Sequence, residues 1–234
     1  MMALPLSGIS GFIVGGIAVL GWAVGIVLDR VVSALSRAML QEMMQRGGTE
    51  FPGVQIRRGS PRWIPFVCAV LSALVAGRYG LTWMTPWGLL LLWALLTLIF
   101  VDLETLFLPD RITLPLLWGG LLANSLGAVT DLHSAVWGAM LGYALLWSVY
   151  WLYWWATRRE GLGYGDFKLL AALGAWLGWQ ALPLILLLAS LSGVVMGLFW
   201  LWRGEHSRHT PIPFGPFLAV AGYGVMLWGK GGLP

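Results

Sequence analysis

Residues 169–202 read LLAALGAWLGWQALPLILLLASLSGVVMGLFWLW, a run of 34 residues without a charged side chain. A helix needs about 20 apolar residues to span the hydrocarbon core of a bilayer, so this run is too long for one comfortable span. We expect it to break at residues 178–180, just before Pro183, because proline is well tolerated in the first turn of a helix. The sequence therefore predicts two membrane helices here, at residues 166–179 and 181–202.

The rest of the chain has the same character. It has 234 residues, of which 59% are hydrophobic and only 10% are charged, whereas about a quarter of a soluble domain is charged. Runs bounded by charges or by Pro/Gly breaks complete a set of eight expected spans. They are residues 8–28, 63–79, 83–101, 112–130, 134–157, 166–179, 181–202 and 211–229. The predicted fold class is an all-α polytopic integral membrane protein.

The basic residues predict a topology. When the N-terminus is placed outside and eight spans alternate, 12 of the 14 Lys and Arg residues fall on the inner side, as the positive-inside rule requires. These 12 are Arg30, Arg37, Arg46, Arg57, Arg58, Arg62, Arg111, Arg158, Arg159, Lys168, Arg203 and Arg208. We therefore expect an inner-membrane protein with both termini periplasmic, whose net charge of +4 reflects topology and does not indicate nucleic acid.

Three parts follow from this topology. Residues 1–28 form the first transmembrane helix, which we expect to be retained because no Lys or Arg precedes it, unlike in a signal peptide. Residues 29–62 form a cytoplasmic loop, in which residues 31–44 suit an amphipathic helix on the inner membrane surface; a role in docking substrate stays open. Residues 63–234 form the membrane-embedded core.

Small residues and the lone cysteine carry structural expectations. The pairs Gly11/Gly15 and Gly21/Gly25 have the spacing that lets membrane helices approach closely. Cys68 is the chain's one cysteine, so neither an intrachain disulfide nor a cysteine-based zinc site is expected.

The acids that could do chemistry lie in two inner connections. Residues 101–115 carry Asp102, Glu104 and Asp110, and Asp166 begins the short segment 166–179. Fourteen helical residues cover about 21 Å, less than the roughly 30 Å hydrocarbon core. Either the outer end of this segment therefore stops short, or its inner end starts below the inner surface. In the second case Asp166 lies below that surface, preceded by a glycine loop that packs in protein or lines a wet cavity.

Asp102 ends an uncharged stretch and lies at a similar expected depth, so the two carboxylates could face one another. Desolvation and mutual repulsion would then leave one proton on the pair at neutral pH. One carboxylate could act as a general base on a water molecule and the other as a general acid toward a peptide carbonyl. Alternatively, Asp166 is a helix N-cap and the acids of residues 101–115 are solvated. The cost of carboxylates at membrane depth favours a functional role.

At these residues the sequence resembles a known family. GYGDFKLL (163–170) is similar to the G-x-G-D signature of the type 4 prepilin peptidases, which are membrane aspartic proteases. DLETLFLPD (102–110) resembles their D-x6-P-D motif, and IPFGPFLA (212–219) resembles a further typical stretch. The resemblance runs from about residue 63 to the end.

The resemblance implies roles for individual residues. Asp102 and Asp166 would be the catalytic pair. Asp110 is expected to be structural, for example as a cap of the next helix, and Glu104 has no catalytic counterpart. The positions expected to shape the site are Gly163, Tyr164, Gly165, Lys168, Pro109 and Asp110.

The resemblance also implies substrates and cofactors. Family members remove the leader of type IV prepilins or type II secretion pseudopilins at the cytoplasmic face of the inner membrane, without a cofactor for proteolysis. Many also N-methylate the new N-terminus with S-adenosylmethionine. This chain departs from the family in its N-terminal third and lacks the Cys-x-x-Cys pairs of the first cytoplasmic loop, which leaves methylation open.

Two other classes of function compete with proteolysis. A proton-coupled transporter could use the two aspartates as relay carboxylates, but it predicts acids near the midplane and an internal repeat, whereas these acids gather at one face. A non-enzymatic scaffold of a pilus or secretion assembly explains the helices but not two aspartate motifs. Asp→Asn substitutions separate these functions, because a scaffold tolerates them and a protease does not.

Overall fold

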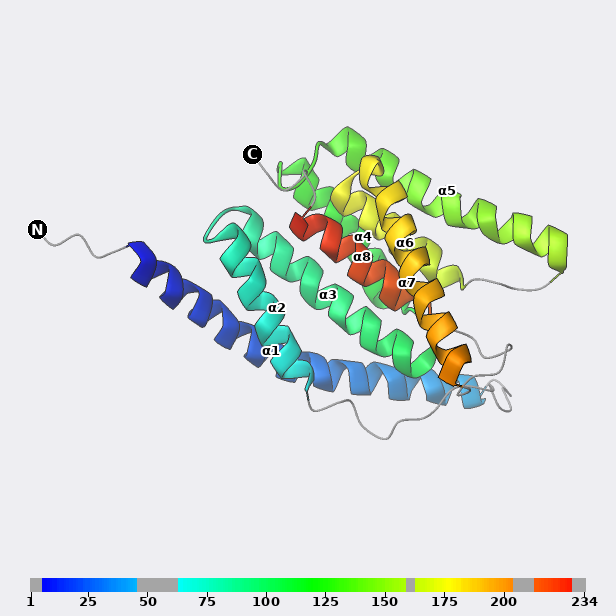
Figure 1. The fold of residues 1–234 in the computed structure, drawn as a ribbon, viewed down its shortest axis with the longest axis horizontal. Helices are drawn as coiled ribbons and strands as arrows, with labels where there is room; N and C mark the ends of the chain where they lie inside the picture. The colour runs from blue at the N-terminus through cyan, green and yellow to red at the C-terminus, as the bar shows by residue number, and fades with distance from the viewer. Residues whose placement is uncertain (1–5, 46–62, 159–162, 204–212, 229–234) are drawn as a thin grey trace, which may run out of the picture.

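The computed structural model describes residues 6–45, 63–158, 163–203 and 213–228, and within these ranges the chain is helical without any strand (Figure 1). The elements are α1 (Leu6–Gln45), α2 (Ile64–Tyr79), α3 (Met84–Thr105), α4 (Asp110–Ser125), α5 (Leu132–Thr157), α6 (Tyr164–Leu177), the 3-10 turn η1 (Trp179–Ala181), α7 (Leu182–Arg203) and α8 (Gly215–Trp228).

The helices confirm the predicted class of a polytopic all-helical membrane protein. A helix lies at each of the eight expected positions. Of the described helices, four are long and apolar enough to cross a membrane: Gly11–Glu42, Met84–Thr105, Leu132–Thr157 and Trp179–Arg203. The helices α2 and α8 are apolar but shorter.

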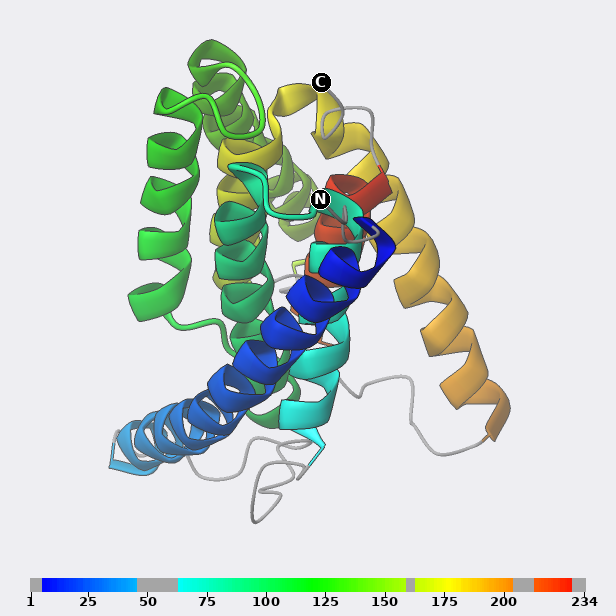
Figure 2. The same cartoon turned by 90° about the vertical axis from the view of Figure 1, so that its left-hand side faces the viewer.

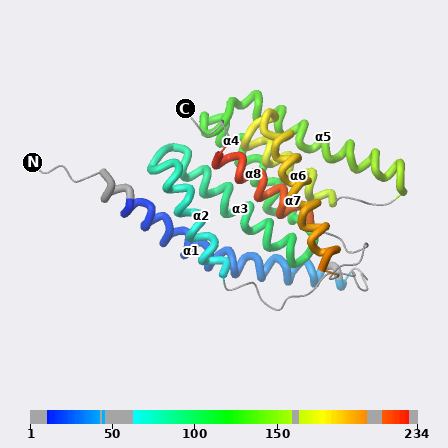
Figure 3. Tube along the Cα trace, in the orientation of Figure 1, coloured from blue at the N-terminus to red at the C-terminus, as the bar shows by residue number. Residues whose placement is uncertain are grey.

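The first helix differs from its expectation. We expected a span over residues 8–28 and a separate surface helix over 31–44, but α1 continues for 40 residues without a break. Residues 29–45 contain neither glycine nor proline, so nothing in the backbone stops the helix. Figure 3 shows that α1 changes direction along its length. The remainder of the predicted loop, residues 46–62, lies outside the described residues.

One of the two glycine pairs in α1 packs as predicted. A Cβ atom at Gly21 would lie 2.5 Å from Oγ of Ser72, and one at Gly25 would lie 2.5 Å from Cα of Pro65. Both contacts are with α2, so these glycines let the two helices touch. A Cβ at Gly11 or Gly15 would meet nothing within 4 Å among the described residues.

The uncharged run breaks where the sequence predicts. Gly178 follows α6 with a φ of +82°, a left-handed conformation that glycine adopts without strain. The turn η1 comes next, and α7 begins at Leu182 with Pro183 in its first turn. The break turns the chain back and leaves α6 with 14 residues.

The short helix α6 lies at the centre of the bundle, and ten of its 14 residues are buried. It packs against α4, α5 and α8, while α8 also contacts α3 and α7, and α3 contacts α1 and α2 (Figures 1 and 2). The C-terminal ends of α1, α3, α5 and α7 all lie at one end of the molecule, on the right in Figure 1.

Glycines allow α5 to touch the backbone of α6. Gly138 and Gly174 face each other, and a Cβ on either would collide with the backbone of the other. One turn along, a Cβ at Gly142 would lie 2.6 Å from the carbonyl oxygen of Leu170. Gly138 and Gly142 have the same small-xxx-small spacing as the pairs in α1, although we did not expect a close contact there.

The other side of α6 is tied to α4 by buried hydrogen bonds. Nε1 of Trp176 donates to the carbonyl oxygen of Leu116 at 2.8 Å, and its ring fills the space above Gly120, where a Cβ would lie 2.6 Å from Cδ1. Nδ2 of Asn124 donates to the carbonyl of Ala175 at 2.7 Å. Its Oδ1 accepts from two backbone N–H groups of the following loop, at 3.0 and 3.1 Å.

Candidate active site

Asp102 lies in the last turn of α3 and is only 4% exposed. The helix ends because Leu106 adopts a left-handed φ of 58° and donates its backbone N–H to the carbonyl of Asp102 at 2.8 Å. Oγ1 of Thr105 donates to the carbonyl of Val101 at 2.8 Å and accepts from the backbone N–H of Phe107 at 3.3 Å. These bonds fix the turn that directly follows Asp102.

Asp166 is the third residue of α6 and is 7% exposed. The N-cap is Gly163, not Asp166, and the carboxyl group of Asp166 lies beside it: a Cβ at Gly163 would be 3.5 Å from Oδ2 of Asp166. This is the reciprocal position that an acid takes in a capping box. Asp166 thus lies in the first turn of α6 but is not its N-cap. The alternative interpretation required it to be the N-cap. The glycine loop before it extends into residues 161–162, which lie outside the described residues.

The fold brings the two predicted catalytic aspartates together. They come from different helices, yet the charge of Asp102 acts on the carboxyl group of Asp166. Leu108 packs against a glycine next to each aspartate. A Cβ at Gly165, which precedes Asp166, would lie 2.7 Å from its Cβ, and a Cβ at Gly215, which borders Asp102, would lie 3.2 Å from its Cδ1. The site therefore joins α3, the loop after it, and the first turns of α6 and α8.

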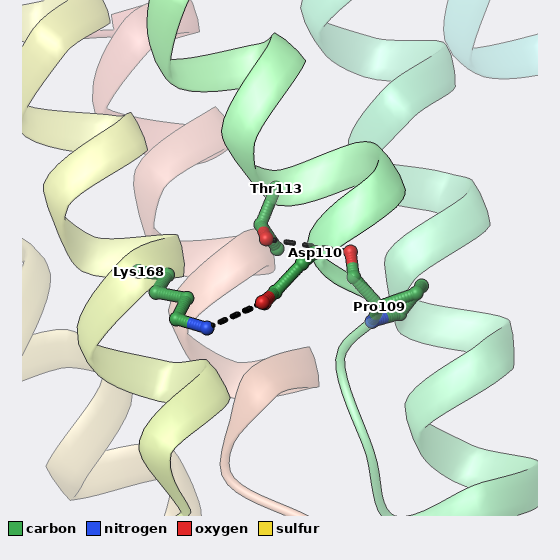
Figure 4. A network of polar contacts seen from close by, with 4 residues as sticks. All are labelled: Pro109, Asp110, Thr113 and Lys168. Carbon is green, nitrogen blue, oxygen red and sulfur yellow. Dashed lines mark hydrogen bonds and ion pairs between the residues drawn. The ribbon is translucent and has the colours of Figure 1, made fainter.

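Lys168 and Asp110 form an ion pair beside this site (Figure 4). Nζ of Lys168 lies 2.6 Å from Oδ1 and 2.7 Å from Oδ2 of Asp110. We expected Asp110 to cap the next helix, but it is the first residue of α4, and Pro109 occupies the N-cap position. The carbonyl of Pro109 instead accepts from Oγ1 of Thr113 at 3.3 Å.

Tyr164 begins α6 and is 53% exposed. Its ring centroid lies 5.2 Å from that of Tyr150 on α5 and 5.5 Å from that of Phe167, and its hydroxyl lies 3.4 Å from the hydroxyl of Tyr150. Such tilted aromatic pairs are favourable. They attach the first turn of α6 to α5, next to Asp166.

Other polar groups are less involved. Glu104 is partly exposed on α3, and among the described residues no group of three His, Cys, Asp or Glu could hold a metal ion. Gly215 lies in a stretch and Leu108 in a motif that stand out in the sequence, but the sequence alone gives neither residue a place in the site. Their contacts with Asp102 and Gly165 join segments far apart in the sequence, which no local pattern reveals.

Comparisons with known proteins agree with this arrangement. Residues 89–198, which include both aspartates, match the model of the type IV leader peptidase family. Proteins named prepilin leader peptidase/N-methyltransferase are similar: 55% identical over 166 residues in Aeromonas hydrophila, 50% over 166 in Pseudomonas aeruginosa and 52% over 165 in Pectobacterium carotovorum.

The similarity is partial in length. It covers 70–71% of this chain but only 57–59% of those three relatives. No solved structure matches the chain. The family match over residues 89–198, which carry both aspartate motifs, together with relatives at 50% identity or more, shows that this part of the chain is similar to the type IV leader peptidase family.

Proposed function

We propose that this protein is a membrane aspartic endopeptidase that removes the leader peptide of type IV prepilins or type II secretion pseudopilins. The observation that carries the proposal is the pair of buried carboxyl groups of Asp102 and Asp166, brought from α3 and α6 to within reach of each other's charge. Paired carboxyl groups of this kind share a proton and can supply a base and an acid together.

The two aspartates suffice for the chemistry. The ionised carboxylate takes a proton from a water molecule, whose oxygen attacks the peptide carbonyl carbon, while the protonated carboxyl gives its proton to the carbonyl oxygen. In the second step the first aspartate gives its new proton to the amide nitrogen and the C–N bond breaks. The second aspartate takes a proton back from the hydroxyl group as the carbonyl forms again. The pair then holds one proton, as at the start.

The position of the pair suits a bond at the membrane surface. Asp102 lies at the C-terminal end of a span and Asp166 lies in the first turn of a helix too short to cross the bilayer fully. We propose that this end faces the cytoplasm and that both chain termini are periplasmic, as the positive-inside rule predicts. A substrate with an apolar helix would then present its scissile bond at this depth.

Cysteine labelling tests this topology. In a Cys68→Ser background, the exposed residues Leu126 and Arg158 are replaced singly by cysteine at opposite ends of the bundle. A membrane-impermeant maleimide should label Leu126→Cys in intact spheroplasts and Arg158→Cys only after permeabilisation. The reverse pattern would place the aspartates on the periplasmic side and contradict the proposed location.

The names of the relatives also imply S-adenosylmethionine, the methyl donor of an N-methyltransferase. Among the described residues, the buried carboxyl groups are those of Asp102 and Asp166, and both belong to the proposed proteolytic pair. A nucleoside cofactor commonly uses a carboxylate to hold its ribose, and the proteolytic pair cannot serve both purposes. We therefore propose cleavage for the described residues and assign them no role in methylation.

Co-expression with a substrate tests cleavage. A prepilin or pseudopilin from the same genome is expressed with wild-type protein, Asp102→Asn or Asp166→Asn, and leader removal is read by mass spectrometry. We expect cleavage by the wild type and by neither variant. Variants that cleave as well as the wild type, or an inactive but folded wild type, would favour a scaffold or a transporter. The same spectrum shows the added mass of a methyl group if the new N-terminus is methylated.

A further inference from the structure

Gly215, the first residue of α8, lies directly against the carboxyl group of Asp102. A Cβ at Gly215 would lie 2.6 Å from Oδ2 and 3.2 Å from Cγ of Asp102, closer than carbon and oxygen atoms pack. No side chain larger than hydrogen fits unless the carboxyl group moves. The position is therefore restricted by the aspartate and not by its own backbone conformation.

The backbone N–H of Gly215 is free to interact with that carboxyl group. Within α8, the first backbone donors are Phe217 and Leu218, which bond to the carbonyl of Phe214 at 3.1 and 3.2 Å. The amide of the first helical residue has no partner inside a helix, and Pro216 has no N–H. The N–H of Gly215 thus has no partner within α8, and it lies close to the carboxyl group of Asp102.

Asp102 has little else to hold it. Its Oδ2 is buried and has no hydrogen-bond partner among the described atoms, and its exposed fraction is only 4%. A buried carboxyl oxygen without a partner is costly, so its orientation depends on the few groups that touch it. The residue that lies beside Oδ2 is Gly215, and Leu108 packs against Gly215 as well.

We propose that Gly215 is a positioning residue for proteolysis, which sets the orientation of the Asp102 carboxyl group toward Asp166 through its free amide and its lack of a side chain. This inference rests on the proposed function. It gives the stretch at residues 212–219 a role in the site, because α8 then contacts the catalytic pair that α3 and α6 carry.

Substitution by alanine separates positioning from folding. Rotation of the Asp102 carboxyl group relieves the collision at small cost to the fold, but misplacing a catalytic group by about 1 Å can lower the rate about 100-fold. We therefore expect Gly215→Ala to reach the membrane with an unfolding temperature near that of the wild type. Its kcat for leader cleavage should fall about 100-fold with KM unchanged, and the pH dependence of kcat should shift.

Gly193→Ala is the matched control. Gly193 lies on α7 and faces the same first turn of α8, but its Cβ would lie 3.7 Å from Cδ2 of Phe217, an ordinary contact. We expect this variant to keep wild-type kcat and an unchanged pH profile. If Gly215→Ala fails to fold, Leu108→Ala/Gly215→Ala is compared with Leu108→Ala, since the shorter side chain removes the second contact and leaves the one with Asp102.

The outcomes are distinct. An active wild type with kcat lost in Gly215→Ala and retained in Gly193→Ala supports the inference. An active wild type with equal kcat and pH profile in Gly215→Ala overturns the inference alone. An inactive wild type overturns the proposed function and the inference with it.

Discussion

The ammonium group of Lys168 lies 2.6 and 2.7 Å from the two carboxylate oxygens of Asp110. Lys168 follows Asp166 by two residues on α6, and Asp110 begins α4 at the end of the loop that leaves Asp102. The ion pair therefore joins the helix that carries Asp166 to the end of the loop that follows Asp102. Its side chains are 29% and 54% exposed. We therefore expect the ion pair to fix the relative position of α4 and α6 and to add little to the free energy of unfolding.

Neutralising either partner should affect turnover more than folding. Exposed ion pairs contribute at most about 1 kcal/mol, so we expect Lys168→Met and Asp110→Asn to unfold within a few degrees of the wild type. Both should lower kcat for leader cleavage, and the double variant should lose no more than either single variant, because the two side chains act as one unit. Fully additive losses would show that they act separately.

The close contact of α5 and α6 should be intolerant of side chains. Gly138→Ala and Gly142→Ala place a Cβ against the backbone of α6, and overpacking of this kind costs about 1–3 kcal/mol. We expect lower unfolding temperatures in detergent and reduced cleavage. Gly77→Ala is the control, because a Cβ at this exposed position of α2 would meet nothing within 4 Å among the described residues. Equal stability in all three variants would contradict the packing.

Asn124 should be essential for the C-terminal end of α6. Asn124→Ala leaves the carbonyls of Ala175 and Trp176 and the amides of Val129 and Thr130 without their side-chain partner. An unsatisfied buried polar group costs about 1–3 kcal/mol, so we expect a loss of at least 2 kcal/mol in a thermal or denaturant unfolding curve. The neighbouring Ser125→Ala removes only an exposed bond within α4 and should change little.

Asp131 should make a small, pH-dependent contribution to stability. The backbone N–H of Ser134, at 2.8 Å from Oδ2, lowers the pKa of Asp131. Because the folded pKa lies below the unfolded value of about 3.9, the contribution is present above that pH and is lost as pH falls through the folded pKa. Asp131→Asn should therefore unfold at a lower temperature than the wild type at pH 6 and equally at pH 2. A constant difference would exclude ionisation as its cause.

Much of the fold could be predicted from the sequence because membrane helices are marked by length and charge. The break at Gly178 and Pro183 was evident from one overlong run. The extent of α1 was not, since a polar amphipathic stretch without glycine or proline has the same pattern whether it continues a span or lies on the membrane surface. Only its contacts with the other helices distinguish the two.

The site was predictable in part for a similar reason. Asp102 and Asp166 stand out as rare acids beside apolar runs and within recognisable motifs. The contacts around them do not stand out, because Gly215 meets Asp102 and Lys168 meets Asp110 only through the three-dimensional packing of α8, α6 and α4. A glycine restricted by a neighbouring carboxyl group looks the same in sequence as one in a flexible loop.

The most direct test of the shared catalytic pair is a comparison of cleavage rates for Asp102→Asn, Asp166→Asn and the double variant, all matched for folding and membrane insertion. If the carboxyl groups act as one unit, each single substitution should abolish turnover as completely as the double substitution. Contradiction would come from single variants that each keep measurable cleavage and a double variant whose loss is the product of the two, since the aspartates would then act independently.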